Sequence, residues 1–117
     1  MPQQMLVAQM LSEKLSTIAH PLRIRIIEAL GARKSDVNSL AEKLNVRQST
    51  LSQHLSLLRT SGIVESERDG RTVRYSLSNP WLATWLLDGC KLLELQKAHM
   101  NEVAEATRAV KKIWRIR

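Results

Sequence analysis

The stretch that decides the fold runs from residue 36 to residue 77 and reads DVNSLAEKLNVRQSTLSQHLSLLRTSGIVESERDGRTVRYSL. Its first half contains two apolar patterns with helical spacing, which are separated only by Asn45 to Arg47. The period then changes, because apolar and polar residues alternate on both sides of Asp69-Gly70, as in the strands of a tight hairpin. The stretch therefore predicts a helix-turn-helix followed by a two-stranded wing.

Helical patterns flank this stretch on both sides. Apolar residues recur at intervals of three and four from Met5 to Ile18, and a second helix is expected to begin at Pro21. From Pro80 onward the pattern is helical for most of the remaining chain. We expect a mainly α protein with a β-hairpin, organised as one winged helix-turn-helix domain over residues 1–117. Its parts would be dimerisation helices at 5–18 and 80–112, a helix-turn-helix at 36–61 and a wing at 63–78.

The ends of these helices are marked by residues with known capping preferences. Asp36 suits the N-cap of the first helix of the motif, and Asn45 suits the left-handed turn that ends it. Gly31 and Gly62 are expected to be C-terminal stops. Asn79, before Pro80, is expected to cap the last helix.

Composition narrows the classes of function. The chain has 117 residues, with 18 Lys and Arg against 11 Asp and Glu, and the formal charge of +7 favours a polyanionic partner, either nucleic acid or an anionic membrane surface. No apolar run is long enough to cross a bilayer, and no signal-peptide pattern opens the sequence, so we expect a cytoplasmic location. The single Cys90 excludes an intrachain disulfide, and no phosphate loop or hydrolase grouping is present. We therefore expect no enzyme activity.

The second helix of the motif has a polar side opposite its apolar side. At about 100° per residue, its Ser and Gln side chains lie opposite the line of Leu51, Leu55 and Leu58, where they could meet base edges in a major groove. The expected base contacts are Gln48, Ser49, Thr50, Ser52 and Gln53, and the expected phosphate or wing contacts are Arg47, Ser56, Arg68, Arg71 and Arg74.

Three further expectations concern the orientation of single side chains in this region. Arg68 and Arg74 are expected to point away from the face formed by Val73, Tyr75 and Leu77. His54 lies beside the buried line, where packing within the domain is favoured over phosphate contact. His20 is expected to start the helix at Pro21.

The stretches LSTIAHPLRIRIIEAL and SLAEKLNVRQSTLSQHLSLLRTSGIVESERDGRTVRYSLS, within residues 15–78, resemble the ArsR-type (ArsR/SmtB) family of bacterial and archaeal transcriptional repressors. The resemblance implies a homodimer paired through the first and last helices. It also implies binding to double-stranded DNA at an imperfect inverted repeat, and release by an inducer, which here is unknown. Family members usually cap the recognition helix with Ser or Thr, whereas this sequence has Arg47, which cannot make the capping bond and is interpreted as a phosphate clamp.

The resemblance also shows where metal-sensing members carry their ligands. The thiolate pair in the first helix of the motif corresponds to Asp36 and Asn38, and the second site corresponds to residues that cannot ligate a metal: Asn79, Trp81, Leu92 and Leu95. A shifted group of Asp88, Cys90, His99 and Glu102 points in different directions around one helix, which leaves only a site across a dimer axis as an alternative. The partner cysteine of thiol-switch members corresponds to Glu28. We expect no metal and no cofactor, with Cys90 as a small apolar residue or, alternatively, a thiol sensor.

The remaining expectation concerns assembly. Too much apolar surface lies on the first and last helices for a small monomer, so a twofold interface is predicted. Its residues are Met5, Leu11, Leu82, Leu86, Leu93 and Met100. Three alternatives stay open: a single-cysteine redox-sensing repressor, a general DNA-coating protein, and a winged-helix module that has lost DNA binding. The basic run from Arg108 to Arg117 would fit the DNA-coating protein.

Overall fold

The computed structural model describes residues 2–116, with side chains as far as residue 113, so Arg115 and Arg117 of the basic run lie outside the described side chains. The chain order is α1 (Gln3–Ile18), α2 (Pro21–Ala32), β1 (Ser35–Asp36), α3 (Val37–Leu44), α4 (Gln48–Thr60), β2 (Val64–Asp69), β3 (Thr72–Leu77) and α5 (Trp81–Ile116). The prediction of a mainly helical protein with a hairpin is confirmed. Contacts divide the described chain into two compact units, with the boundary between Thr84 and Trp85 inside α5.

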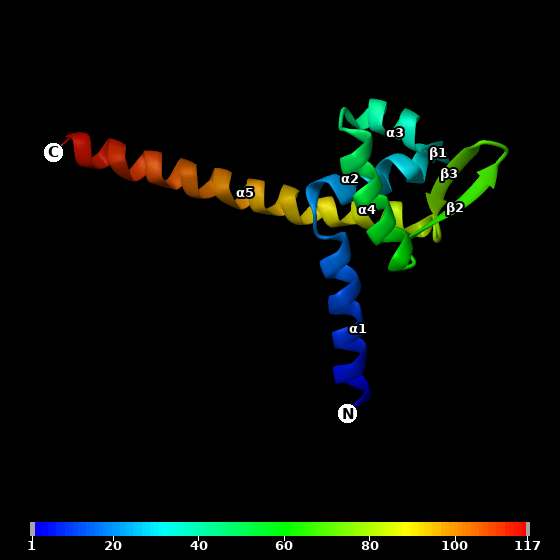
Figure 1. Cartoon of the computed structure of the whole chain (residues 1–117). Coiled ribbons are helices and arrows are strands. Elements are labelled where there is room, and N and C mark those ends of the chain that lie inside the picture. The colour runs from blue at the N-terminus through cyan, green and yellow to red at the C-terminus, as the bar shows by residue number, and fades with distance from the viewer. Residues whose placement is uncertain (1, 117) are drawn as a thin grey trace. The chain divides into compact units, whose positions relative to one another are not determined.

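The core of the first unit lies among α2, α3, α4 and the base of the hairpin. In Figure 1, β2 and β3 project from these helices as a wing. The largest side chains that are fully buried are Ile26, Ile27, Leu40, Leu51, Leu55, Leu58 and Val64. Apolar residues spaced three and four apart form one stripe on each helix, so burying them fixes which side of α4 faces solvent.

The predicted helix caps at α2 and α3 are confirmed. The His20 Nδ1 atom accepts a hydrogen bond from the Leu22 backbone N–H at 3.1 Å, and Asp36 Oδ1 accepts one from the Ser39 N–H at 2.6 Å. The Ser39 N–H, helped by the Ser39 hydroxyl and Arg74, lowers the pKa of Asp36 below its ordinary value. Asn45 ends α3 with a left-handed backbone, φ 54° and ψ 52°, so α4 follows after a tight turn.

The two glycines expected to stop helices behave differently. Gly62, after α4, has a φ of 76° and is a true stop, as predicted. Gly31 is not a stop, because α2 continues through it to Ala32. A Cβ added to Gly31 would lie 2.4 Å from the Cβ of Ala83 in the first turn of α5. Gly31 therefore allows two helices to approach closely, which is a tertiary reason that the sequence did not reveal.

The sheet has one strand more than the sequence predicted. The short strand β1 pairs with β3 through Ser35 and Tyr75, giving the antiparallel order β1-β3-β2. Because Asp69 pairs with Thr72, the two-residue turn of the hairpin consists of Gly70 and Arg71, one position later than predicted. The φ of 66° at Gly70 supplies the backbone conformation that the first central residue of such a turn needs. This register decides which side chains of the wing lie directly opposite each other.

Candidate nucleic-acid interface

The solvent-facing side of α4 is polar, and its side chains are exposed. Gln48, Ser49, Thr50, Ser52 and Gln53, the predicted base contacts, are all exposed, whereas Leu51 and Leu55 behind them have no exposed surface. In the described part of the chain, none of these polar side chains makes a hydrogen bond to another residue. Their donors and acceptors are therefore free to meet base edges, and their small size suits a major groove. The predicted phosphate contact Ser56 is also exposed on α4.

The N-terminus of α4 is open in the way that anion binding requires. Arg47 occupies the N-cap with extended backbone and makes no side-chain capping bond, as predicted. The first N–H groups of a helix carry partial positive charge and have no partner within the helix. The exposed Arg47 side chain beside them adds a full charge. This end of α4 is therefore suited to a DNA phosphate.

The arginines of the wing do not share one face, which corrects the sequence prediction. Residues directly opposite in an antiparallel pair have side chains on the same face. Arg68 pairs with Val73, so it lies on the face of Val73 and Tyr75 and not away from it, whereas Arg74 pairs with Glu67 on the other face. The cause is the length of the turn, because a two-residue turn pairs even-numbered residues of β2 with odd-numbered residues of β3 wherever it is centred. The exposed Arg71 lies at the tip, as predicted.

Arg74 is surrounded by opposite charge. Its Nε atom lies 4.0 Å from Asp69 Oδ2, its pairing partners are Glu67 and Asp36, and both side chains of the ion pair are mostly exposed. A small hollow of about 260 Å³ on this side of the wing is lined by Lys34, Glu67, Arg68, Asp69, Arg74 and Ser76. The carboxylates of Asp69 and Glu67 reduce the attraction that Arg74 offers to a phosphate. Sequence reasoning missed Lys34, because only the pairing of β1 brings it beside the wing.

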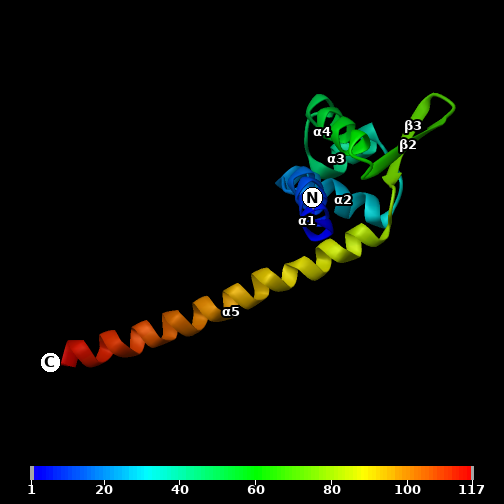
Figure 2. The same cartoon turned by 90° about the horizontal axis from the view of Figure 1, so that it is seen from below.

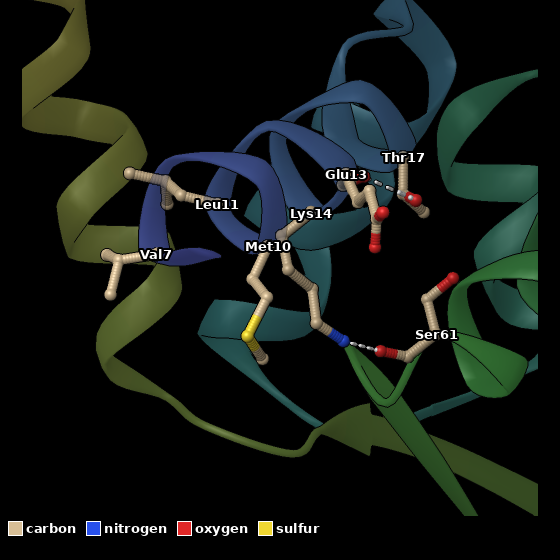
Figure 3. Close-up of a pocket in the computed structure, with 7 residues that line it drawn as sticks. All are labelled: Val7, Met10, Leu11, Glu13, Lys14, Thr17 and Ser61. Atoms are coloured by element: carbon tan, nitrogen blue, oxygen red, sulfur yellow. Dashed lines mark hydrogen bonds between the residues drawn. The ribbon is translucent and has the colours of Figure 1, made fainter. Parts of the chain in front are cut away.

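Side-chain bonds from Arg59 and Lys14 connect the C-terminal end of α4 to other elements, and sequence patterns gave no signal for either. Arg59, in the last turn of α4, donates from Nη1 to Ser66 Oγ on β2 at 3.3 Å. Lys14 of α1 donates to the backbone carbonyl of Ser61 just after α4, as Figure 3 shows. These contacts connect the recognition helix to the wing on one side and to the first helix on the other.

His54 lies inside the domain, as predicted. Its Nδ1 atom accepts a hydrogen bond from Arg23 Nε at 3.1 Å, and its ring lies 4.5 Å from the ring of His20, measured between centroids. Loss of water around the ring, together with the neighbouring His20 and Arg23, lowers the pKa of His54 below its ordinary value of about 6.5. His54 thus packs within the domain, where the neutral form of its ring is favoured.

The residues predicted for a dimer interface are only partly covered by the chain itself. Met5 and Leu11 on α1 are 58% and 52% exposed, and Leu93 and Met100 on α5 are 66% and 59% exposed. Leu82 and Leu86 are half-buried. A groove of about 580 Å³ beside α1 has apolar walls, and Figure 3 shows its lining residues: Val7, Met10, Leu11, Glu13, Lys14, Thr17 and Ser61. Apolar side chains from a second chain would fit this surface.

The second unit consists of α5 from Trp85 onward. Figure 2 shows α5 as one continuous helix. Cys90 is exposed there, and its thiol contacts the Leu86 carbonyl at 3.8 Å, so the chain alone does not bury it as the apolar interpretation expects. Over residues 2–116 no three His, Cys, Asp or Glu side chains gather in a way that could hold a metal ion. No helix in that range has the length and apolar character to cross a membrane.

The two closely spaced helices α3 and α4 and the adjoining hairpin define a winged helix-turn-helix DNA-binding protein. A family model described as bacterial regulatory protein, arsR family, matches residues 20–66. The uncharacterized HTH-type transcriptional regulator Rv0081 of Mycobacterium tuberculosis is 37% identical over 99 residues, which are 84% of this chain and 87% of that protein. The chain belongs to the arsR family of bacterial regulatory proteins, as the resemblance predicts.

Solved structures support the same assignment. The crystal structure of Rv0081 matches with a TM-score of 0.69 at 35% identity, covering 86% of this chain and 97% of that one. The structure of NolR from Sinorhizobium fredii matches with a TM-score of 0.70 at 34% identity, covering 79% of this chain and 92% of that one. The protein is thus a DNA-binding transcriptional regulator. Proteins of this family act on transcription and are not enzymes, as the composition predicted.

Proposed function

We propose that the protein is a dimeric transcriptional repressor that binds an imperfect inverted repeat in double-stranded DNA and leaves it in response to a signal. The observation that carries this proposal is the exposed, unpaired Ser, Thr and Gln face of α4, opposite a fully buried leucine line. A relative named transcriptional repressor PagR, from Bacillus anthracis, is 37% identical over 70 residues, 59% of this chain and 70% of PagR. Such a repressor works beside the chromosome, which supports the cytoplasm as its location.

The roles of the side chains follow from their positions. Gln48, Ser49, Thr50, Ser52 and Gln53 read base edges, while Arg47 and Ser56 contact phosphates beside α4. On the wing, Arg71 at the tip and Arg68 reach the adjacent backbone or minor groove. Arg74 contributes least among the wing arginines, because Asp69 and Glu67 share its face.

A homodimer gives these contacts their twofold arrangement. The exposed apolar residues of α1 and α5, with the groove beside α1, supply the surface that a second copy covers. Two recognition helices must then enter major grooves about 34–36 Å apart. The interface residues proposed are Met5, Leu11, Leu82, Leu86, Leu93 and Met100.

Footprinting on the protein's own upstream DNA, combined with sedimentation at micromolar concentration, tests this function. We expect a dimer and a discrete protected site with twofold symmetry. Uniform protection along the DNA would instead identify a general DNA-coating protein. A monomer that binds no genomic fragment would point to a winged-helix module without DNA binding.

Single substitutions in α4 and the wing should change binding in different ways. Gln53→Ala should reduce discrimination between the operator and a site mutated at one base pair by about 1–3 kcal/mol, because a base-edge contact is lost. Arg71→Ala should weaken binding to operator and random DNA alike, because a phosphate contact carries no sequence information. Fluorescence anisotropy with both DNAs measures each effect. Equal losses on operator and random DNA for Gln53→Ala would refute base reading by α4.

Operator binding should not depend on Cys90 or on a metal ion. Cys90→Ser should keep the affinity of wild type, and chelators should leave both binding and its regulation unchanged, since the family's ligand positions hold Asp36, Asn38, Asn79, Trp81, Leu92 and Leu95. Gel shifts with and without oxidant and chelator check this.

The exposure of Cys90 favours one specific competitor, a single-cysteine redox sensor. In that case an oxidant would release wild type from DNA while Cys90→Ser stayed bound. Stoichiometric zinc that is lost on His99→Ala would likewise overturn the metal-free assignment.

A further inference from the structure

One polar cluster joins three helices behind the recognition face, and the functions above do not use it. Arg23 on α2 donates from Nε to His54 Nδ1 on α4 at 3.1 Å and from Nη1 to the carbonyl of Thr17 at 2.9 Å. Thr17 lies in the last turn of α1, a helix proposed for the dimer. A single guanidinium thus connects the recognition helix to α1, and all of these bonds are partly buried.

The protonation state of His54 is part of this connection. Arg23 Nε–H is a donor and has no acceptor capacity, so the His54 Nδ1 atom that faces it carries no proton. The His20 ring lies beside it, and its own Nδ1 accepts from the Leu22 N–H at the start of α2. A proton on His54 Nδ1 would remove the acceptor and place a cation against the Arg23 guanidinium.

No side chain beside His54 would stabilise its protonated form. The groups acting on His54 are His20 before α2 and Arg23 on α2, and both disfavour its charged form. Among residues 2–116, no charged side chain of α1, α3 or β2 makes a hydrogen bond or ion pair with His54. The nearest contribution from α1 is the neutral Thr17 carbonyl, held through Arg23.

We propose that Arg23 is a positioning residue that fixes the recognition helix α4 through neutral His54, and that protonation of His54 weakens operator binding. The inference rests on the proposed function, since it needs α4 to read DNA. We expect operator-bound α4 to keep the Arg23–His54 bond for a larger fraction of the time than free α4 does, so that DNA binding excludes the proton from Nδ1. By linkage, each proton excluded on binding weakens affinity by at most about tenfold per pH unit as the pH falls.

The same linkage determines how the free energy of unfolding changes with pH. Because the fold lowers the pKa of His54, the stability that its neutral form contributes is fully present above about pH 6.5, the ordinary value. That stability is lost as the pH falls through the lowered value. Acid therefore acts on the fold and on DNA binding in the same direction.

The test compares operator affinity at pH 7.5 and pH 5.5 by anisotropy, with circular dichroism confirming folded protein at both. Wild type should bind about fivefold or more weakly at the lower pH. His54→Asn, whose amide oxygen can replace Nδ1 as acceptor but cannot be protonated in this range, should bind like wild type at pH 7.5 and lose most of this pH response. His99→Asn, which removes an exposed histidine from α5, is the matched control and should keep the response. Arg23→Lys, which cannot reproduce both bonds, should weaken binding already at pH 7.5.

A second measurement does not depend on any variant folding. Titration of the His54 ring by NMR in wild type should show a lower pKa in the operator complex than in the free protein. An unchanged or raised pKa, or an equal acid response in His54→Asn and wild type, would overturn this inference alone. Absence of operator binding at pH 7.5 would instead overturn the proposed function.

Discussion

Raising the salt concentration from about 50 mM to about 200 mM should weaken operator binding by roughly 10³- to 10⁵-fold. The physical cause is counterion release, because a dimer presents Arg47, Arg68 and Arg71 twice to DNA phosphates, together with Arg74 and the N-termini of both α4 helices. Anisotropy titrations over this range give the slope of log affinity against log salt. Affinity that stays constant over the range would refute the phosphate roles.

The wing arginines provide an internal comparison within the same titrations. Arg71→Ala should reduce the slope by about two for the dimer, since one phosphate contact per protomer is lost. Arg74→Ala should change the slope much less, because Asp69 lies 4.0 Å from its Nε atom and Glu67 shares its face. Equal changes for the two variants would show that the carboxylates do not offset the charge of Arg74.

Gly31→Ala should destabilise the fold by about 1–3 kcal/mol, the range typical of an added methyl in a filled site. The new Cβ would lie 2.4 Å from the Cβ of Ala83, so α2 and the first turn of α5 must move apart. The gain of about 0.5–1 kcal/mol from replacing a helical glycine is too small to offset this. Urea unfolding at one fixed protein concentration measures the change.

Gly89→Ala is the matched control, because a Cβ at Gly89 in α5 meets nothing within 4 Å. That variant should be slightly more stable than wild type. The double variant Gly31→Ala with Ala83→Gly should recover stability relative to the sum of its single changes. A Gly31→Ala protein as stable as Gly89→Ala would show that the two helices separate without cost.

Much of the recognition unit could be predicted from sequence, because local rules decide it. Helical spacing identified the buried side of α4 and hence its exposed Ser and Gln side. The caps at His20, Asp36 and Asn45 depend on atoms within a few residues of each other, so residue type and position were sufficient. The family resemblance rested on the same stretch, and family membership confirmed it.

What only the tertiary structure decided depends on residues far apart in the chain. Residue type alone predicts a helix stop at Gly31, and only the close approach of Ala83 explains a glycine inside α2. The strand β1 likewise forms only because it pairs with β3. The pairing of Arg68 with Val73 and of Arg74 with Glu67 depends on the turn at Gly70-Arg71, because a turn displaced by one residue changes every cross-strand pair. The bond from Arg23 to His54 joins two helices that no periodicity relates. The sequence thus predicted which surface faces the DNA, and tertiary packing determined how that surface is held in place and which charges lie beside it.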